Sequence, residues 1–269
     1  LAVIDGSLKV SYPLVPGHEF SGTICQVGEG VSGLQHGQTV AVNPLIPCHR
    51  CSVCEQQRFH KCPHLRMMGV DVDGACCEET EIPADRVFPV PLDLSFAEAA
   101  MAEPVAAVLA VADVPLISTE VGIILGDNRI AVLTQRVLQS VTGLAPKVLS
   151  PSEADCLPED SIDYVIESQL TSAVLLSAIR ILRPGGTLVV KSRQQGQMSL
   201  DSLAALRKEI LIRFAHYGSF QQAVDLLASR AVVVDDLIGR QFLLSEFSEA
   251  IAWARRSESR KTFLKVGDP

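Results

Sequence analysis

Apolar and polar positions divide the chain into a first part with short strands and a second part in which strands alternate with helices. Up to about residue 90, short apolar runs are separated by Gly and Pro turns, a pattern typical of a β-rich domain. A shift to Ala, Glu, Met and Val then predicts a helix over 95–113 with Ser95 as its N-cap. The strands predicted before this helix are 20–27, 39–43, 79–83 and 87–90.

After about residue 113 the pattern becomes that of an α/β protein. A continuous apolar run at 121–125 predicts a strand, and the apolar spacing of 129–140 predicts a helix. Strands that alternate with helices predict a doubly wound parallel sheet covered on both faces. The remaining predicted elements are strands at 148–149, 162–166, 187–191 and 262–266, and helices at 171–182, 220–229 and 244–256.

Composition narrows the classes of function. The chain has 269 residues, enough for two domains, and its 48% hydrophobic and 5% aromatic content fits an aliphatic α/β core. A net charge of -8 argues against nucleic acid as a partner. No apolar run reaches the roughly 18 to 20 residues of a membrane span, and no secretion signal opens the chain, so we expect a cytoplasmic protein. The chain starts at Leu1 rather than Met, as a fragment would.

Four cysteines lie within fifteen residues, a spacing suited to a metal in a reducing compartment. Four thiolates can surround one zinc ion tetrahedrally, and a site with four sulfur ligands is closed and therefore structural. The alternative, four unrelated buried thiols, conflicts with the Arg, Gln, His and Lys residues around them. The predicted ligands of a structural Zn²⁺ are Cys48, Cys51, Cys54 and Cys62.

His18 and Glu19 form a second candidate for metal binding. A neutral imidazole beside a carboxylate can hold a borderline cation, and neighbouring glycines allow the turns that aim both side chains inward. On these residues alone, a surface loop in which His18 caps a strand end explains the sequence better than a metal site does.

At these positions the sequence resembles the zinc-containing medium-chain alcohol and polyol dehydrogenases, such as sorbitol and threonine dehydrogenases. The resemblance rests on three features: the zinc-site run from Gly17-His18-Glu19 to Gly28 and Val31, the four cysteines downstream, and Glu103-Pro104. It covers nearly the whole chain. It implies a GroES-like catalytic domain at 1–112, a Rossmann-type nucleotide-binding domain at 113–236, and a segment at 237–269 that returns to the first domain.

The resemblance also implies site residues. His18 and Glu103 would be ligands of a catalytic Zn²⁺, and Glu19 would be a ligand or a close neighbour of that ion. Family members also carry a zinc-binding cysteine shortly before the position at which this chain begins. Either an N-terminal segment is missing from the sequence, or the metal site is incomplete.

A nucleotide site is predicted where a strand leads into a helix. The residues are Gly126, Asp127, Asn128, Arg129, Ile130 and Ala131. In a GxGxxG turn the glycines let the backbone approach a pyrophosphate at the helix N-terminus. Here the three positions are Gly126, Asn128 and Ala131, and Asn128 places a side chain where the backbone should meet phosphate. An ordinary strand-to-helix turn explains the local sequence as well as an NAD or NADP site does.

The segment after this turn is short. Only 37 positions separate Gly126 from Asp163, whereas one βαβ unit takes about 30 residues or more. An acidic residue for the ribose, expected about 20 positions after the glycines, would fall near 146–150, where the polar residues are Lys147 and Ser150. We therefore expect a shortened sheet that lacks a strand and a helix around 143–146.

Two functional hypotheses follow. The first is a zinc-dependent, NAD(P)-linked oxidoreductase acting on the CH–OH group of a small alcohol or polyol, assembled as a homodimer or homotetramer, with no nucleic-acid or membrane partner. The second is an inactive or repurposed binding protein that keeps this fold and only the structural zinc. The absent cysteine, Asn128 and the short ribose region favour the second.

Overall fold

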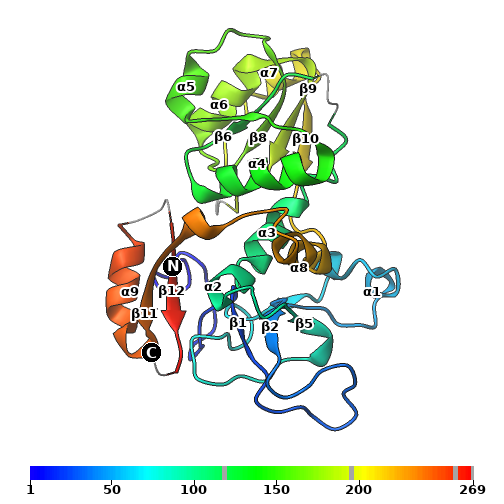
Figure 1. Cartoon of the computed structure of the whole chain (residues 1–269). Helices are drawn as coiled ribbons and strands as arrows, with labels where there is room; N and C mark the ends of the chain where they lie inside the picture. Colours follow the sequence, from blue (N-terminus) through cyan, green and yellow to red (C-terminus); the bar gives the residue numbers. More distant parts are fainter. Residues whose placement is uncertain (117–119, 194–196, 257–259, 268–269) are drawn as a thin grey trace. The chain divides into compact units, whose positions relative to one another are not determined.

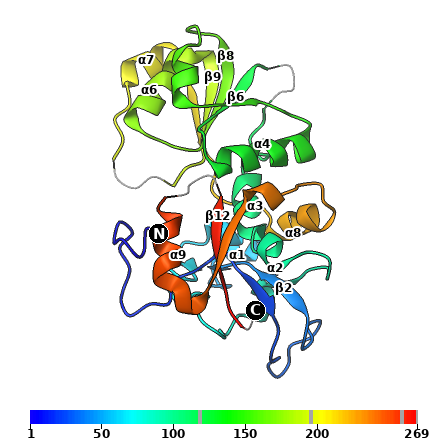
Figure 2. The same cartoon turned by 60° about the vertical axis from the view of Figure 1, so that its left-hand side comes forward.

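The computed structural model describes residues 1–116, 120–193, 197–256 and 260–267, which form two compact units (Figures 1 and 2). One unit comprises Leu1–Pro104 and Phe220–Pro269, so both ends of the chain belong to it. The other unit comprises Val105–Ser219. The domain boundaries predicted after residues 112 and 236 stay predictions.

The first unit is built from short strands and short helices. Its antiparallel sheet has the order β1-β2-β5, a second antiparallel pair is β3-β4, and β11 runs parallel to β12. Buried Val40, Val42 and Met68 form the centre of the core around the main sheet. The elements are β1 (Ser21–Thr23), β2 (Thr39–Val42), β3 (Leu45–Ile46), α1 (Ser52–Glu55), η1 (Phe59–Lys61), β4 (Arg66–Met67), η2 (Ala84–Arg86), β5 (Val87–Pro89), α2 (Phe96–Ala99), α8 (Phe220–Ala228), η3 (Asp235–Leu237), β11 (Ile238–Leu243), η4 (Leu244–Glu246), α9 (Phe247–Ala254) and β12 (Lys261–Lys265).

Three predictions for this unit need correction. The strand predicted at 20–27 is limited to the three residues of β1. The strand predicted at 79–83 is irregular backbone. Glu79 and Glu81 are exposed and only Ile82 packs against the core, so the segment has too little apolar surface for a half-buried strand. The helix predicted over 95–113 is two helices, α2 and α3 (Ala102–Leu109). Since Pro104 has no N–H, it fits in the first turn of a new helix better than in the middle of a longer one. Ser95 is the N-cap of α2, as predicted, and its Oγ accepts a hydrogen bond from the Glu98 N–H at 3.3 Å.

The second unit is a parallel sheet with helices on both faces, as the pattern predicts (Figure 1). Alternate residues along each strand pack on opposite faces: Leu125 and Val165 lie with α5 and α6, whereas Ile124 and Ile166 lie with α4. Its elements are the end of α3, β6 (Gly122–Leu125), α4 (Arg129–Thr142), β7 (Lys147–Leu149), α5 (Pro151–Asp155), β8 (Ile162–Glu167), α6 (Ser172–Ile181), β9 (Leu182–Val190), α7 (Ser202–Arg207) and β10 (Leu211–Phe214).

The strand order of this sheet is β10-β9-β8-β6-β7. A six-stranded Rossmann sheet has the order 3-2-1-4-5-6, in which the chain leaves strand 1 in one direction and later returns to its other side. With β6 as strand 1, the described residues supply five of the six positions and β7 is an edge strand. The carboxyl ends of β6 and β8 meet where the direction of winding reverses, which is the ligand-binding edge of such sheets.

No helix in the described ranges is long and apolar enough to cross a membrane.

Candidate metal centres and nucleotide site

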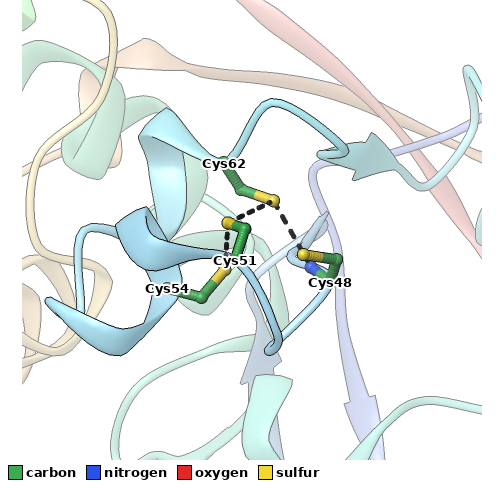
Figure 3. Close-up of side chains that lie close together, drawn as sticks. All are labelled: Cys48, Cys51, Cys54 and Cys62. Carbon is green, nitrogen blue, oxygen red and sulfur yellow. Dashed lines mark hydrogen bonds between the residues drawn. The ribbon is translucent and has the colours of Figure 1, made fainter.

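The four predicted cysteine ligands lie on the excursion between β3 and β4. Cys51 is the N-cap of α1, Cys54 lies within α1, and Cys62 ends η1, so the short helical turns bring sequence neighbours together. Their four Sγ atoms lie within 4.8 Å of one another, and Figure 3 shows the four side chains converging. The Cys51 Sγ is 3.5 Å from that of Cys54 and 3.9 Å from that of Cys62. Tetrahedral zinc with bonds of about 2.3 Å requires sulfur separations of about 3.8 Å, so these four cysteines, the cysteine cluster, fit the ion.

The cluster also has the electrostatics of a cation site. The backbone N–H of Arg50 lowers the pKa of the Cys48 thiol to about 6. Burial, together with the neighbouring sulfurs, raises the pKa of the Cys54 thiol to about 12. Four thiolates this close repel one another, and a bound cation removes that repulsion because metal binding displaces the thiol protons.

The segment between β3 and β4 that carries the four cysteines, here called the cluster's lobe, is contacted by side chains that follow it in the sequence. His49 Nε2 lies 3.1 Å from an Asp85 carboxylate oxygen, which also accepts a hydrogen bond from Arg86 at 2.8 Å. The buried Arg86 guanidinium lies over the Phe59 ring, 5.4 Å from its centre, and donates to the Leu45 carbonyl oxygen. An ion pair, a cation–π contact and a hydrogen bond therefore connect the lobe to η2 and β3.

His18, Glu19 and Glu103, here called the mixed group, come together from distant parts of the sequence. One potential ligand atom from each lies within 4.8 Å of the others. His18 Nε2 is 3.7 Å from Glu19 Oε1, and Glu103 is 3% exposed. A carboxylate buried to that degree is costly without a balancing cation, and one imidazole with two carboxylates is a donor set that suits zinc.

Gly17 explains how the turn before His18 is made. Its φ is +103°, and a Cβ there would lie 2.9 Å from the Cys76 sulfur. Gly74 packs against Gly17 even more closely, since its own Cβ would come within 2.1 Å of the Gly17 carbonyl oxygen. The tight turn predicted from the glycine beside His18 is thus present, and only small residues fit around it.

Lys261 on β12 is a site residue that sequence reasoning missed. Its ammonium contacts Glu19 Oε2, and its side chain is 12% exposed. Burial lowers the pKa of the Lys261 ammonium to about 7, while the adjacent carboxylate favours the charged form. Nothing near Lys261 in the sequence signals this contact, because it depends on β12 packing beside the turn that carries Glu19.

The predicted nucleotide loop lies at the carboxyl end of β6. Gly126 has a φ of +143°, and a Cβ there would lie 2.2 Å from Ser168 Oγ, so this position requires glycine. Asn128 is the N-cap of α4, Arg129 and Ile130 begin that helix, and Ala131 is fully buried against the sheet. Asp127 is exposed at the tip of the loop. The loop therefore has the shape of a dinucleotide turn, with an amide side chain at its centre.

Glu167, at the carboxyl end of β8, is a second residue of this edge that the sequence did not single out as a site. Its Oε1 accepts hydrogen bonds from the backbone N–H of Lys191 at 2.9 Å and of Ser192 at 3.0 Å. Burial raises the pKa of the Glu167 carboxyl. Its side chain ties the end of β8 to the end of β9, beside the loop that carries Gly126.

A family model for the alcohol dehydrogenase GroES-like domain matches residues 1–92. Among curated proteins, the chain is 26% identical to a probable D-xylulose reductase A of Aspergillus clavatus, over 96% of this chain and 82% of that protein. It is also 26% identical to a sorbitol dehydrogenase of Bacillus subtilis, over 97% of this chain and 82% of that protein.

Among solved structures, the chain is similar to a putative zinc-binding dehydrogenase from Sinorhizobium meliloti that was crystallised with NADP. The TM-score is 0.86 at 23% identity, covering 98% of this chain and 86% of the other. At this level of identity the match establishes the fold. The predicted combination of a GroES-like domain with a Rossmann-type parallel sheet is confirmed.

Proposed function

We propose that this chain, a member of the zinc-containing medium-chain alcohol and polyol dehydrogenase family, is an NAD(P)-linked oxidoreductase. In this proposal it transfers hydride between the CH–OH group of a small polyol and the nicotinamide. Its curated relatives are named for xylulose reduction and for sorbitol oxidation, so D-xylulose and D-sorbitol are the first substrates to test. The observation that carries the proposal is the mixed group, whose three ligand atoms lie within 4.8 Å of one another.

Each member of the mixed group has a distinct proposed role. His18 and the buried Glu103 would hold zinc, and Glu19 would take part through Oε1, the oxygen that faces His18. When bound there, zinc polarises the substrate oxygen and lowers the pKa of the alcohol. Lys261 contacts the other oxygen of Glu19, and so balances the charge of this carboxylate in the absence of metal.

The proposed nucleotide site is the edge of the parallel sheet where β6 and β8 end. Gly126 allows the backbone to turn tightly beside Ser168, and α4 begins immediately afterwards. A helix N-terminus offers backbone N–H groups and a positive field to a pyrophosphate. The bound nicotinamide supplies hydride transfer, while the loop from Gly126 to Ala131 determines how the phosphates are held.

The cysteine cluster has a structural role in this proposal. With four sulfur ligands a zinc ion has no open position, so the cluster stabilises its lobe and does not bind substrate. None of the eight cysteines, all of which lie in the described ranges, forms a disulfide, in keeping with the proposed location in the cytoplasm.

The proposed assembly is a homodimer or homotetramer. It is supported by β10, an edge strand of the parallel sheet on which Leu211 is 51% and Phe214 is 80% exposed. An edge strand with apolar side chains is a surface that another strand can cover. Light scattering on the purified chain tests this part, and a monomer at micromolar concentration would contradict it. A net charge of -8 supports the absence of a nucleic-acid partner.

A second candidate is a binding protein that retains the fold and only the zinc of the cysteine cluster. It is favoured by Asn128, whose side chain already bonds the first N–H groups of α4.

The deciding experiment is elemental analysis of zinc per chain, paired with titrations of NAD(H) and NADP(H) and assays with D-sorbitol and D-xylulose. Two zinc ions, nucleotide binding and turnover support the dehydrogenase. One zinc ion, no nucleotide binding and no turnover would support the binding protein instead.

A further inference from the structure

Asn128 makes contacts that a glycine at its position could not make. Its Oδ1 accepts hydrogen bonds from the backbone N–H groups of Ile130 at 2.9 Å and Ala131 at 3.0 Å. These are donors of the first turn of α4, which have no carbonyl four residues earlier within the helix to bond. The Ala131 N–H is shared between this side chain and the Asn128 backbone carbonyl oxygen, which lies at 3.1 Å. In a dinucleotide site, such donors face the pyrophosphate. The chain's own carboxamide oxygen therefore stands where a phosphate oxygen would accept.

The same carboxamide is anchored at its other end. Asn128 Nδ2 donates to the Ser168 carbonyl oxygen at 3.1 Å, and Ser168 N donates to the Leu125 carbonyl oxygen at 3.0 Å. The side chain thus spans from the beginning of α4 to the residue that follows β8. Both ends of this bridge lie at the ligand-binding edge of the sheet, where β6 and β8 finish.

A negative charge at the loop tip also opposes phosphate binding. Asp127 is exposed immediately before Asn128, and its carboxylate repels a second anion that approaches the same backbone. Gly126 and Ala131 keep the shape of the turn, so the loop has lost neither its tight bend nor its packing on the sheet. The loop differs from a GxGxxG or GxGxxA loop only at Asn128, which together with Asp127 would face the phosphates.

We propose that Asn128 is an intramolecular plug of the phosphate-binding turn, and that it sets the affinity for the dinucleotide. Its carboxamide oxygen occupies the N–H groups of Ile130 and Ala131, and a pyrophosphate binds there only when this side chain has turned away. The inference rests on the proposed function, since it assumes that the cofactor is a nicotinamide dinucleotide bound at this turn.

The test compares the full chain with Asn128→Gly and Asn128→Asp. Glycine is an accepted N-cap residue and removes the plug, whereas aspartate keeps the cap and adds a negative charge. ADP-ribose, which contains the pyrophosphate, is titrated by calorimetry, with adenosine as the ligand that lacks phosphate. We expect Asn128→Gly to bind ADP-ribose about ten-fold more tightly than the unaltered chain, because the three hydrogen bonds of the Asn128 side chain no longer have to be broken. We expect Asn128→Asp to bind it about ten-fold more weakly, and adenosine affinity to stay the same in all three.

Thermal unfolding of the three proteins checks that each is folded. Equal affinity of the unaltered chain and Asn128→Gly for ADP-ribose would overturn the inference and leave the proposed function standing. Weaker binding by Asn128→Gly would also overturn it, because the amide would then be a phosphate ligand. If none of the three binds ADP-ribose, NADH or NADPH, the nucleotide part of the proposed function fails together with the inference.

Discussion

The cysteine cluster and the mixed group both gather proposed metal ligands in the same unit, but they are assembled in different ways. The cluster takes four ligands from fifteen consecutive residues, and two short helical turns bring them together. The mixed group takes two ligands from the turn before β1 and a third from α3. Local backbone geometry builds the first group, whereas the second exists only when the unit has folded around it.

This difference predicts opposite couplings between metal and stability. A cluster formed by a loop with little core of its own needs the ion to hold its shape, because repulsion among four thiolates opposes folding of the lobe. The mixed group is positioned by the turn at Gly17 and the packing of α3, so its shape does not depend on a metal. Removing metal should therefore unfold the lobe of the cysteine cluster and leave the mixed group in place.

The largest effect is expected for Cys54→Ser. Cys54 is buried within α1, its Sγ lies 3.5 Å from that of Cys51, and the hydroxyl that replaces its thiol is a poor zinc ligand. We expect the zinc content to fall by one ion per chain and the free energy of unfolding to fall by roughly 4 kcal/mol. Elemental analysis and urea unfolding measure both. Cys156→Ser, an exposed cysteine outside the lobe, is the control that should change neither. If Cys54→Ser keeps its zinc, the cluster is not the structural site.

Glu103→Gln makes the contrasting change at the mixed group. It keeps the size of the side chain and removes the charge, so zinc binding at this group should be lost while the cluster keeps its ion. We expect kcat/KM to fall by at least about 100-fold, or about 2.7 kcal/mol of transition-state stabilisation, with the metal-free protein no less stable. Assays and unfolding are compared with Glu81→Gln, an exposed residue of the same unit. A large loss of stability would show that Glu103 supports the fold rather than the metal.

The sequence predicted features that local segments build, and it missed features that depend on the packing of distant segments. The cysteine spacing, the Ser95 cap and the alternation of strands and helices around β6 and β8 are local patterns, and the structure has them. Lys261 could not be predicted as a neighbour of Glu19, because the contact depends on how β12 packs. The short elements α5, α7, β10 and β11 were also missed, because their brief or partly exposed runs lack a clear apolar period.

The nucleotide loop was predicted in part. Its tight turn at Gly126 and the position of Asn128 were both visible in the sequence. The hydrogen bonds that convert Asn128 from a misplaced side chain into a helix cap involve Ser168, which a linear motif does not include. Only the folded sheet shows that these residues meet.

Lys261→Met removes the internal cation that contacts the mixed group. The Lys261 ammonium and a metal ion compete for the same Glu19 carboxylate. Replacing the ammonium with an apolar side chain of similar length should strengthen zinc binding at this group about ten-fold, or about 1.4 kcal/mol. The measurement is competition with a zinc chelator in the absence of nucleotide. Lys265→Met, an exposed lysine on the same strand, is the matched control, and equal affinities in the two variants would refute the competition.

The smallest effect is expected for Asp85, which contacts the cluster's lobe through His49. Asp85 is half-exposed and contacts both His49 and Arg86, and ion pairs of this exposure contribute up to about 1 kcal/mol. Asp85→Asn should therefore lower the free energy of unfolding by about 0.5 kcal/mol and speed zinc loss to a chelator by a few-fold, without changing the number of ions bound. Asp71→Asn, on a separate loop of the same unit, gives the baseline for losing an aspartate charge. If Asp85→Asn instead releases the zinc completely, the cysteines alone do not define the site, and the contrast between a locally built cluster and a fold-built mixed group would no longer hold.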